Sequence, residues 1–147
     1  MEKIASFRID HIRLNPGLYV SRRDEKNALC VTTFDLRFTA PNREPVMDMP
    51  AVHTIEHLGA SFLRSSARKA DIVYFGPMGC RTGFYLILAG ETPVETVRGL
   101  MADTFRFIAD YEGAIPGASP RECGNYSDMD LPGAKARAAK YLTVLEE

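Results

Sequence analysis

The chain has 147 residues, a length typical of one domain, and we expect residues 1–147 to form a single domain. Hydrophobic residues make up 46% of it and charged residues 25%, the balance of a globular protein with its own core. The formal net charge of −1 comes from interspersed acidic and basic residues, which argues against a nucleic-acid partner. No apolar run approaches the ~20 residues that span a bilayer, and the N-terminus lacks the apolar core of a signal peptide. We therefore expect a cytoplasmic protein without a membrane partner.

Three cysteines, Cys30, Cys80 and Cys123, are an odd number that poorly matches the disulfide framework of a secreted protein. In a reducing compartment, cysteine is used for packing, metal binding or catalysis. Each of the three thiols therefore needs its own assignment.

The first half of the chain predicts two strands and a helix. Residues 18–23 and 29–39 read as strands, joined by the polar residues 24–27. Alternation in the second strand places one set of side chains on an apolar face: Cys30, Thr32, Phe34, Leu36 and Phe38. The other face carries Thr33, Asp35 and Arg37, and we expect it to be partly exposed to water. A helix is predicted over residues 51–69, because Pro50 suits a first turn and apolar residues follow at helical spacing.

The second half predicts two more strands and two helices. Strands are expected over residues 71–75 and 81–89, with a Gly-Pro-Met-Gly break at residues 76–79. Thr92 and Glu95 have the spacing of a capping box, ahead of a helix that ends near Gly113. A last helix is expected over residues 131–145. Strands and long helices mixed in this order predict an α+β fold, with an antiparallel sheet packed against several helices.

The sharpest motif of the chain is His-Thr-Ile-Glu-His, from His53 to His57. Histidines four residues apart lie on one face of a helix, one turn apart, so both imidazoles can bind one metal ion. Glu56 precedes the second histidine, and its carboxylate can act as a base beside the metal without being a ligand. The plainer interpretation is a helix with two surface or core histidines, although the chain has only three histidines in all.

A catalytic metal site usually has three protein ligands and one open position, so the third ligand must come from elsewhere in the chain. The candidates are His11, the three cysteines and many carboxylates. Cys30 alternates with phenylalanines and is better explained as a small buried side chain. Cys123 precedes Gly124 in a polar stretch between two predicted helices. A turn there could present the thiol to a metal, and simple burial is equally compatible with the pattern.

Cys80 lies at the exit of a glycine-rich bend, Gly76-Pro77-Met78-Gly79-Cys80-Arg81-Thr82-Gly83. Glycines on both sides of a reactive side chain let a substrate approach closely. A nearby cation would favour the thiolate, which could act as a base or acid at neutral pH. An ordinary connection between two strands is the alternative, and composition alone does not reject it.

Together these motifs resemble the S-ribosylhomocysteine lyase (LuxS) family along nearly the whole chain. The matching segments occur in the family's order and at about its spacing: Ser6-Phe7 with Asp10-His11, Phe34-Asp35-Leu36-Arg37-Phe38 before Pro41-Asn42, His53-Thr54-Ile55-Glu56-His57-Leu58, Pro77-Met78-Gly79-Cys80-Arg81-Thr82-Gly83-Phe84-Tyr85, and Cys123-Gly124. This combination is far more specific than the histidine motif alone.

The resemblance implies a homodimer with two identical active sites at the subunit interface. It implies that His53, His57 and Cys123 bind one divalent metal, Fe(II) or in its place zinc or cobalt, with water as the fourth ligand. The implied substrate is S-ribosylhomocysteine. The implied products are homocysteine and 4,5-dihydroxy-2,3-pentanedione, the precursor of autoinducer-2, which would join homocysteine recycling to quorum sensing.

The resemblance also implies roles for individual residues. Cys80, as a thiolate, would move protons between carbons and shift the sugar carbonyl along the chain, with the metal as Lewis acid. Glu56 would be an acid and base for the enediol hydroxyls and for the later proton transfers around the β-elimination. Ser6, His11 and Arg37, from the same or the partner subunit, are implied to orient the sugar and to stabilise the Cys80 thiolate. Arg64 is implied to contact the homocysteine end of the substrate.

One position departs from the family. Many members have an aspartate six residues before the catalytic cysteine, near the amino-acid end of the substrate, and here that position is Tyr74. Because the metal ligands and Cys80 are retained, we expect the same class of reaction with different contacts at that end of the substrate.

Two other functions fit the histidine motif. An inverted-zincin peptidase would use Glu56 to activate a zinc-bound water, with a downstream carboxylate as third ligand in place of Cys123. A structural metal domain would have a fourth protein ligand, for which Cys80 is available, and no open position. The identity of the third and fourth ligands separates both from the lyase.

Overall fold

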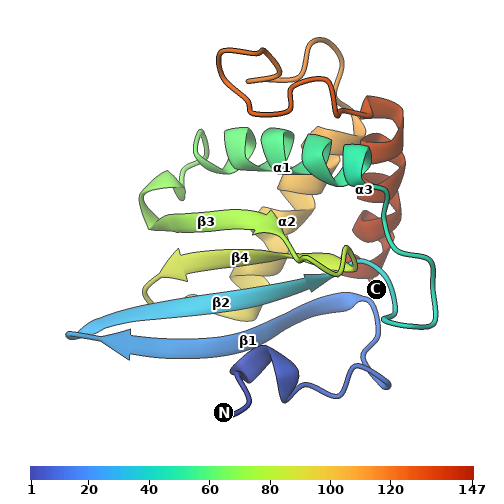
Figure 1. The fold of residues 1–147 in the computed structure, drawn as a ribbon. Helices are drawn as coiled ribbons and strands as arrows, with labels where there is room; N and C mark the ends of the chain where they lie inside the picture. The colour runs from blue at the N-terminus through green and yellow to red at the C-terminus, as the bar shows by residue number, and fades with distance from the viewer.

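A computed structural model describes residues 1–147 and contains a four-stranded antiparallel sheet, covered on one face by three helices (Figure 1). The strands, in the sheet order β1-β2-β4-β3, are β1 (Gly17–Lys26), β2 (Leu29–Arg37), β4 (Gly83–Ala89) and β3 (Ile72–Pro77). The helices are α1 (Met49–Leu63), α2 (Val94–Ala109) and α3 (Leu131–Leu145), with the short 3-10 helices η1 (Ala5–Phe7) and η2 (Lys69–Asp71). The predicted α+β class with an antiparallel sheet is confirmed. None of the helices is both long and apolar enough to cross a membrane.

The main core lies between the sheet and the helices. Phe34 and Leu36 of β2 are fully buried there, in one cluster with Ile55 of α1 and Phe105 of α2. Complete burial of side chains of this size stabilises the fold by ~1.5–3 kcal/mol each, so this cluster fixes which face of α1 turns inward. The predicted apolar face of β2 is confirmed except at Cys30, which is only half-buried.

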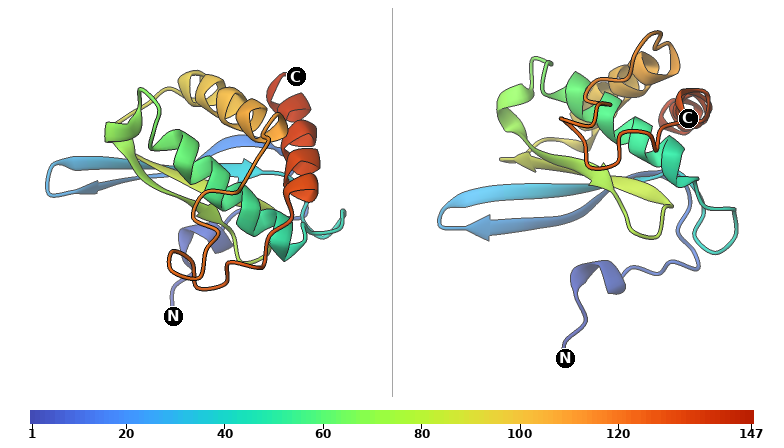
Figure 2. Two further views of the ribbon diagram at one scale, coloured as in Figure 1. Left: turned by 90° about the horizontal axis from the view of Figure 1, so that it is seen from above. Right: turned by 45° about the horizontal axis from the view of Figure 1, so that its top comes forward.

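The opposite face of the sheet is covered by the N-terminal segment, residues 1–16, which lies on the side away from the helices (Figure 2). Ser6 of this segment and Thr33 of β2 line the same small cavity. Asp35 and Arg37, on the same face of β2, are each only 1% exposed. The expectation of a partly wet face was therefore wrong for this strand. Sequence alternation shows which side chains share a face, but not that a distant segment covers it.

Two connections differ from their predicted boundaries. The turn between β1 and β2 is only Asn27 and Ala28, whose φ angles of 51° and 67° suit a tight hairpin, so the polar residues before it belong to the strand. Helix α1 ends at Leu63, although residues 51–69 were predicted to be helical. The hydroxyl of Ser66 donates to the carbonyl of Leu63 at 2.7 Å and turns the chain away there.

The predicted capping box before α2 was wrong. Pro93 is the N-cap residue, and no side chain caps this helix. The hydroxyl of Thr92 instead accepts a hydrogen bond from Arg68 at 3.0 Å. Helix α3 does have a side-chain cap, because Asp130 accepts from the backbone N–H of Gly133 at 3.0 Å.

Candidate metal centre and substrate cavity

Helix α1 presents His53 and His57 on one face, away from its buried side. The ring centroids lie 4.7 Å apart, with the planes at 83° to each other. Val52 and Ile55, between and beside them in sequence, are buried in the core and fix the rotation of the helix. The predicted placement of both imidazoles on one helix face, one turn apart, is confirmed, with the rings edge to face.

Cys123 reaches these imidazoles from the loop between α2 and α3, which passes alongside α1 (Figure 2). Its Sγ lies 3.5 Å from Nε2 of His53. The ligand atoms of His53, His57 and Cys123 all lie within 4.8 Å of one another, so the three could hold one metal ion. The backbone N–H of Asn125 donates to the same sulfur at 3.4 Å. Neither a carboxylate nor Cys80 belongs to this cluster.

Backbone carbonyls determine which nitrogen of each histidine faces the cluster. Nδ1 of His53 lies 2.9 Å from the carbonyl of Asp128, and Nδ1 of His57 lies 2.7 Å from the carbonyl of Pro116. A carbonyl only accepts hydrogen bonds, so Nδ1 carries the proton and Nε2 offers its lone pair. Gly117, with φ +71°, lets the loop turn directly beside His57. Two imidazoles and a thiolate are donors that suit zinc, Fe(II) or cobalt.

A second group of residues surrounds a cavity of about 530 Å³. The cavity lies between the N-terminal segment, the loop after β2 and the β3–β4 connection. Its lining includes four residues that the sequence predicts for the site: Ser6, His11, Arg37 and Cys80. The three residues of the metal cluster do not line it.

Cys80 is exposed at the tip of the β3–β4 connection. Strand β3 extends two residues into the predicted break, and β4 starts only at Gly83. A Cβ on Gly83 would lie 2.2 Å from the carbonyl oxygen of Leu36, so only glycine allows the two strands to approach this closely. Arg81 has a left-handed backbone, φ 61°, and its N–H donates to the carbonyl of Met78 at 3.0 Å. This tight turn directs Cys80 outward.

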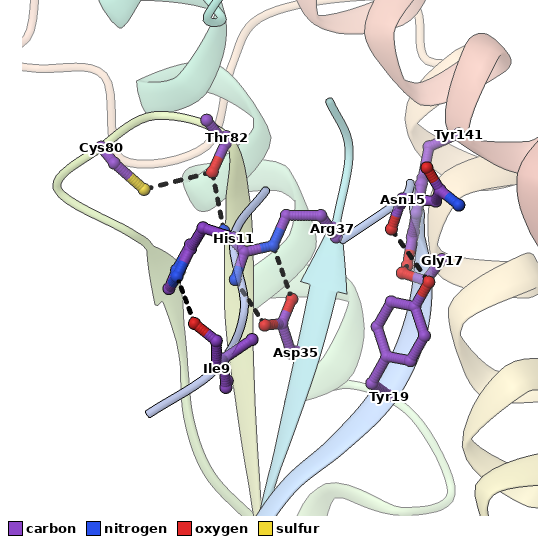
Figure 3. A network of polar contacts seen from close by, with 10 residues as sticks. All are labelled: Ile9, His11, Asn15, Gly17, Tyr19, Asp35, Arg37, Cys80, Thr82 and Tyr141. Atoms are coloured by element: carbon purple, nitrogen blue, oxygen red, sulfur yellow. Dashed lines mark hydrogen bonds and ion pairs between the residues drawn. The ribbon is translucent and has the colours of Figure 1, made fainter. Parts of the chain in front are cut away.

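A buried ion pair lies next to Cys80 (Figure 3). Arg37 donates from Nε to one oxygen of Asp35 at 3.1 Å and from Nη2 to the other at 2.5 Å. Its Nη1 donates to the hydroxyl of Thr82 at 2.8 Å, and that hydroxyl lies 3.1 Å from Sγ of Cys80. Burial raises the pKa of the Asp35 carboxyl, and the hydrogen bonds and charge of Arg37 oppose that rise.

Three predicted or flagged residues lie outside both groups. Glu56 is half-buried on α1 and does not line the cavity that contains Cys80. Arg64 is exposed, and its guanidinium donates to the carbonyl of Val73 at 3.2 Å. Tyr74 is 48% exposed and lines a smaller cavity, of about 210 Å³, on the face of the sheet that the N-terminal segment covers.

Several residues of the site were not singled out from the sequence. Tyr85 lines the large cavity, and burial, reinforced by the nearby charge of Asp35, raises the pKa of its phenol, so the phenol is protonated at neutral pH. Asp35 had a local signal, since it lies two residues from Arg37 on one face of a strand. The only sequence signal for Thr82 was its nearness to Cys80. The carbonyls that orient the histidines gave no sequence signal, because every residue has a backbone carbonyl.

Comparison with known proteins places the chain in a family. A family model described as S-Ribosylhomocysteinase (LuxS) matches residues 4–147. The S-ribosylhomocysteine lyase of Finegoldia magna is 57% identical over 145 residues, which cover 99% of this chain and 92% of the relative. That of Clostridium acetobutylicum is 54% identical over 147 residues (99% and 93%), and that of Phocaeicola vulgatus 56% over 143 residues (97% and 89%). The chain therefore belongs to the S-ribosylhomocysteinase (LuxS) family.

Proposed function

We propose that the protein is a metal-dependent S-ribosylhomocysteine lyase. It would convert S-ribosylhomocysteine to homocysteine and 4,5-dihydroxy-2,3-pentanedione, the precursor of autoinducer-2, in the cytoplasm. The family match over residues 4–147 supports this reaction. The observation that carries it is the convergence of His53, His57 and Cys123 on one point, with no fourth protein ligand in the cluster.

We assign His53, His57 and Cys123 as the ligands of one divalent metal, with Fe(II) first and zinc or cobalt as alternatives. The metal, when bound, supplies a Lewis acid that stabilises negative charge on substrate oxygens. The protein contributes the orientation of the ligands, because the carbonyls of Pro116 and Asp128 keep both Nε2 lone pairs directed at the cluster.

We assign Cys80 as the group that moves protons between the carbons of the sugar. Its sulfur is exposed in the large cavity, and the buried cation of Arg37 is linked to it through one hydroxyl. A thiolate there would take a proton from the carbon next to the sugar carbonyl and return it to the former carbonyl carbon. Two such shifts move the carbonyl to carbon 3. Removal of the proton on carbon 4 then expels homocysteine thiolate from carbon 5 by β-elimination.

The remaining assignments concern protons on oxygen and the position of the substrate. Glu56 would exchange protons with the sugar hydroxyls, a role supported by its place between the two ligands in sequence. Ser6 and His11 line the cavity with Cys80 and would orient the sugar, as would Arg37. Arg64 would bind the amino-acid end of the substrate.

We propose that the active form is a homodimer with the sites at the subunit interface. Phe7 and Val46 line the cavity that contains Cys80 and are 70% and 37% exposed, and Ile12 nearby in sequence is 78% exposed. A second subunit would cover these apolar side chains. It would also bring further groups to a cavity that the metal ligands of the same chain do not line.

The function is tested by incubating the purified protein with S-ribosylhomocysteine and measuring the released thiol. Homocysteine should appear, should stop appearing after a chelator removes the metal, and should return when Fe(II), zinc or cobalt is added back. Release that is unaffected after complete removal of the metal would contradict the assignment.

Cys123→Ala separates the lyase from the peptidase. The variant should lose most of its bound metal, measured by elemental analysis, together with homocysteine release, because one of three ligands is gone. Cys30→Ala, the same substitution at a half-buried cysteine outside the cluster, is the matched control and should keep both. A Cys123→Ala variant that retains its metal and cleaves peptides would favour the inverted-zincin alternative.

A further inference from the structure

Thr82 stands between the buried cation Arg37 and the exposed thiol of Cys80 (Figure 3). Thr82 is 4% exposed, while Cys80 is exposed and lines the cavity. Its backbone is fixed as well, because its carbonyl accepts from the N–H groups of Phe38 at 2.9 Å and Thr39 at 3.1 Å. The Thr82 hydroxyl is therefore held in one place at the boundary between the core and the cavity.

The chemistry of the three groups orders their hydrogen bonds. The guanidinium of Arg37 can only donate, so the Thr82 oxygen accepts from it at 2.8 Å. The hydroxyl proton of Thr82 then remains for its other neighbour, the sulfur of Cys80 at 3.1 Å. A thiolate can only accept, so with ionised Cys80 the direction is fixed: Arg37 donates to Thr82, and Thr82 donates to the sulfur. A hydrogen bond to a charged acceptor is about twice as strong as a neutral one.

Asp35 keeps the cation in place for this arrangement. Both of its oxygens accept from Arg37, from Nε and Nη2, which leaves Nη1 directed at Thr82. Both residues are only 1% exposed, so the guanidinium is held in this orientation at the wall of the cavity that Arg37 lines. The charge of Arg37 acts on Cys80 through one polarised hydroxyl, which strengthens the bond to the sulfur.

We propose that Thr82 is a positioning residue that holds Cys80 in its thiolate form by donating a hydrogen bond that Arg37 and Asp35 keep oriented. The inference deepens the proposed function and rests on the role of Cys80 as the base. Other groups that face the same cavity are His11 from the N-terminal segment, Glu44 from the loop after β2, and Tyr85 from β4. Tyr85 stays neutral at neutral pH, and none of these three forms a hydrogen bond with the sulfur.

The test measures how fast Cys80 of the metal-loaded protein reacts with iodoacetamide between pH 5 and 9, with the modified cysteine identified by peptide mass spectrometry. No substrate is needed, and only the thiolate reacts. Thr82→Val removes the hydroxyl and keeps the shape of the side chain. It should move the midpoint of the rate profile to higher pH by about one unit, and so slow alkylation at neutral pH by up to about 10-fold. Thr82→Ser keeps the hydroxyl and should restore most of the rate.

Thr104→Val is the matched control, since this buried threonine donates to the carbonyl of Leu100 within α2 and has no contact with the site. It should leave the profile of Cys80 unchanged. An unchanged profile in Thr82→Val would overturn the proposal, as would equal slowing in Thr82→Val and Thr82→Ser, which would point to packing of the methyl group. Homocysteine release by the unmodified protein is measured separately. If homocysteine release is absent but the alkylation profile shifts as expected, the role of Thr82 stands and the proposed reaction fails. If release is normal and the alkylation profile does not shift, the proposed reaction stands and the role of Thr82 fails.

Discussion

Replacing Cys80 by alanine is expected to reduce homocysteine release by at least about 10²–10⁴-fold, because a positioned acid or base contributes a factor of that size and Cys80 is assigned to more than one proton transfer. The bound metal should be retained, since Cys80 does not belong to the cluster of His53, His57 and Cys123. The two measurements are a thiol assay with S-ribosylhomocysteine and the metal content of the same sample.

The matched control is again Cys30→Ala, which removes a thiol from β2 at a position that lines none of the cavity around Cys80. Its rate and metal content should equal those of the unmodified protein. Loss of metal in Cys80→Ala would mean that Cys80 is a fourth ligand. That result would favour a metal that only stabilises the fold, and the lyase assignment of Cys80 would have to be abandoned.

Arg37→Met should destabilise the protein by about 3–5 kcal/mol at neutral pH, because it leaves the carboxylate of Asp35 buried without its charge partner. Both side chains are almost fully buried, at 1% and 2% exposed, so water cannot replace the lost contacts. The measurement is the free energy of unfolding from urea denaturation of the metal-loaded protein.

The loss should depend on pH in a defined direction. Burial already raises the pKa of Asp35 above 3.8, and Arg37 opposes that rise, so removing Arg37 should raise the folded-state pKa further. An acid with a raised pKa binds its proton more tightly when folded, so its contribution to stability falls as pH rises from 3.8 through the folded value. The deficit of Arg37→Met should therefore be smallest in acid and largest near neutrality.

Two further variants test whether the loss comes from the unpaired buried charge. Arg22→Met breaks an ion pair with Asp24 on the surface of β1, where the side chains are 52% and 38% exposed, and should cost less than about 1 kcal/mol. Combining Arg37→Met with Asp35→Leu removes both buried charges and should recover much of the lost stability. A single Arg37→Met variant as stable as the unmodified protein would show that the pair does not hold this part of the sheet.

The sequence predicts this fold best where the signal is local. The last helix, Leu131–Leu145, matches its predicted range because a proline and an acidic cap mark its start and apolar spacing continues to its end. The cover over Asp35 and Arg37 could not be predicted in this way, because it depends on where the N-terminal segment runs in space. Thr92 has the spacing of a helix cap, but a side chain from the segment after α1 occupies its hydroxyl.

The residues of the site likewise differ in how far sequence alone could place them. Helical periodicity alone places His53 and His57 together, since their relation is set within one turn. Cys123 is 70 residues from His53 in sequence and only 3.5 Å away in space. From the residues alone, burial of this cysteine was equally compatible, and the family resemblance indicated that it is a ligand. The link from Arg37 to Cys80 through Thr82 required coordinates, because it joins the end of β2 to the connection between β3 and β4.

The loop between α2 and α3 both supplies the sulfur of the cluster and holds the two imidazoles through the carbonyls of Pro116 and Asp128. Both contacts join backbone carbonyls to ring nitrogens of the same chain, so the loop itself sets the direction of both Nε2 lone pairs. Imidazole and thiolate donors suit several divalent metals, so we expect this cluster to accept more than one of them. The metal that would occupy it in the cell would then depend on supply as much as on the geometry of the three donors.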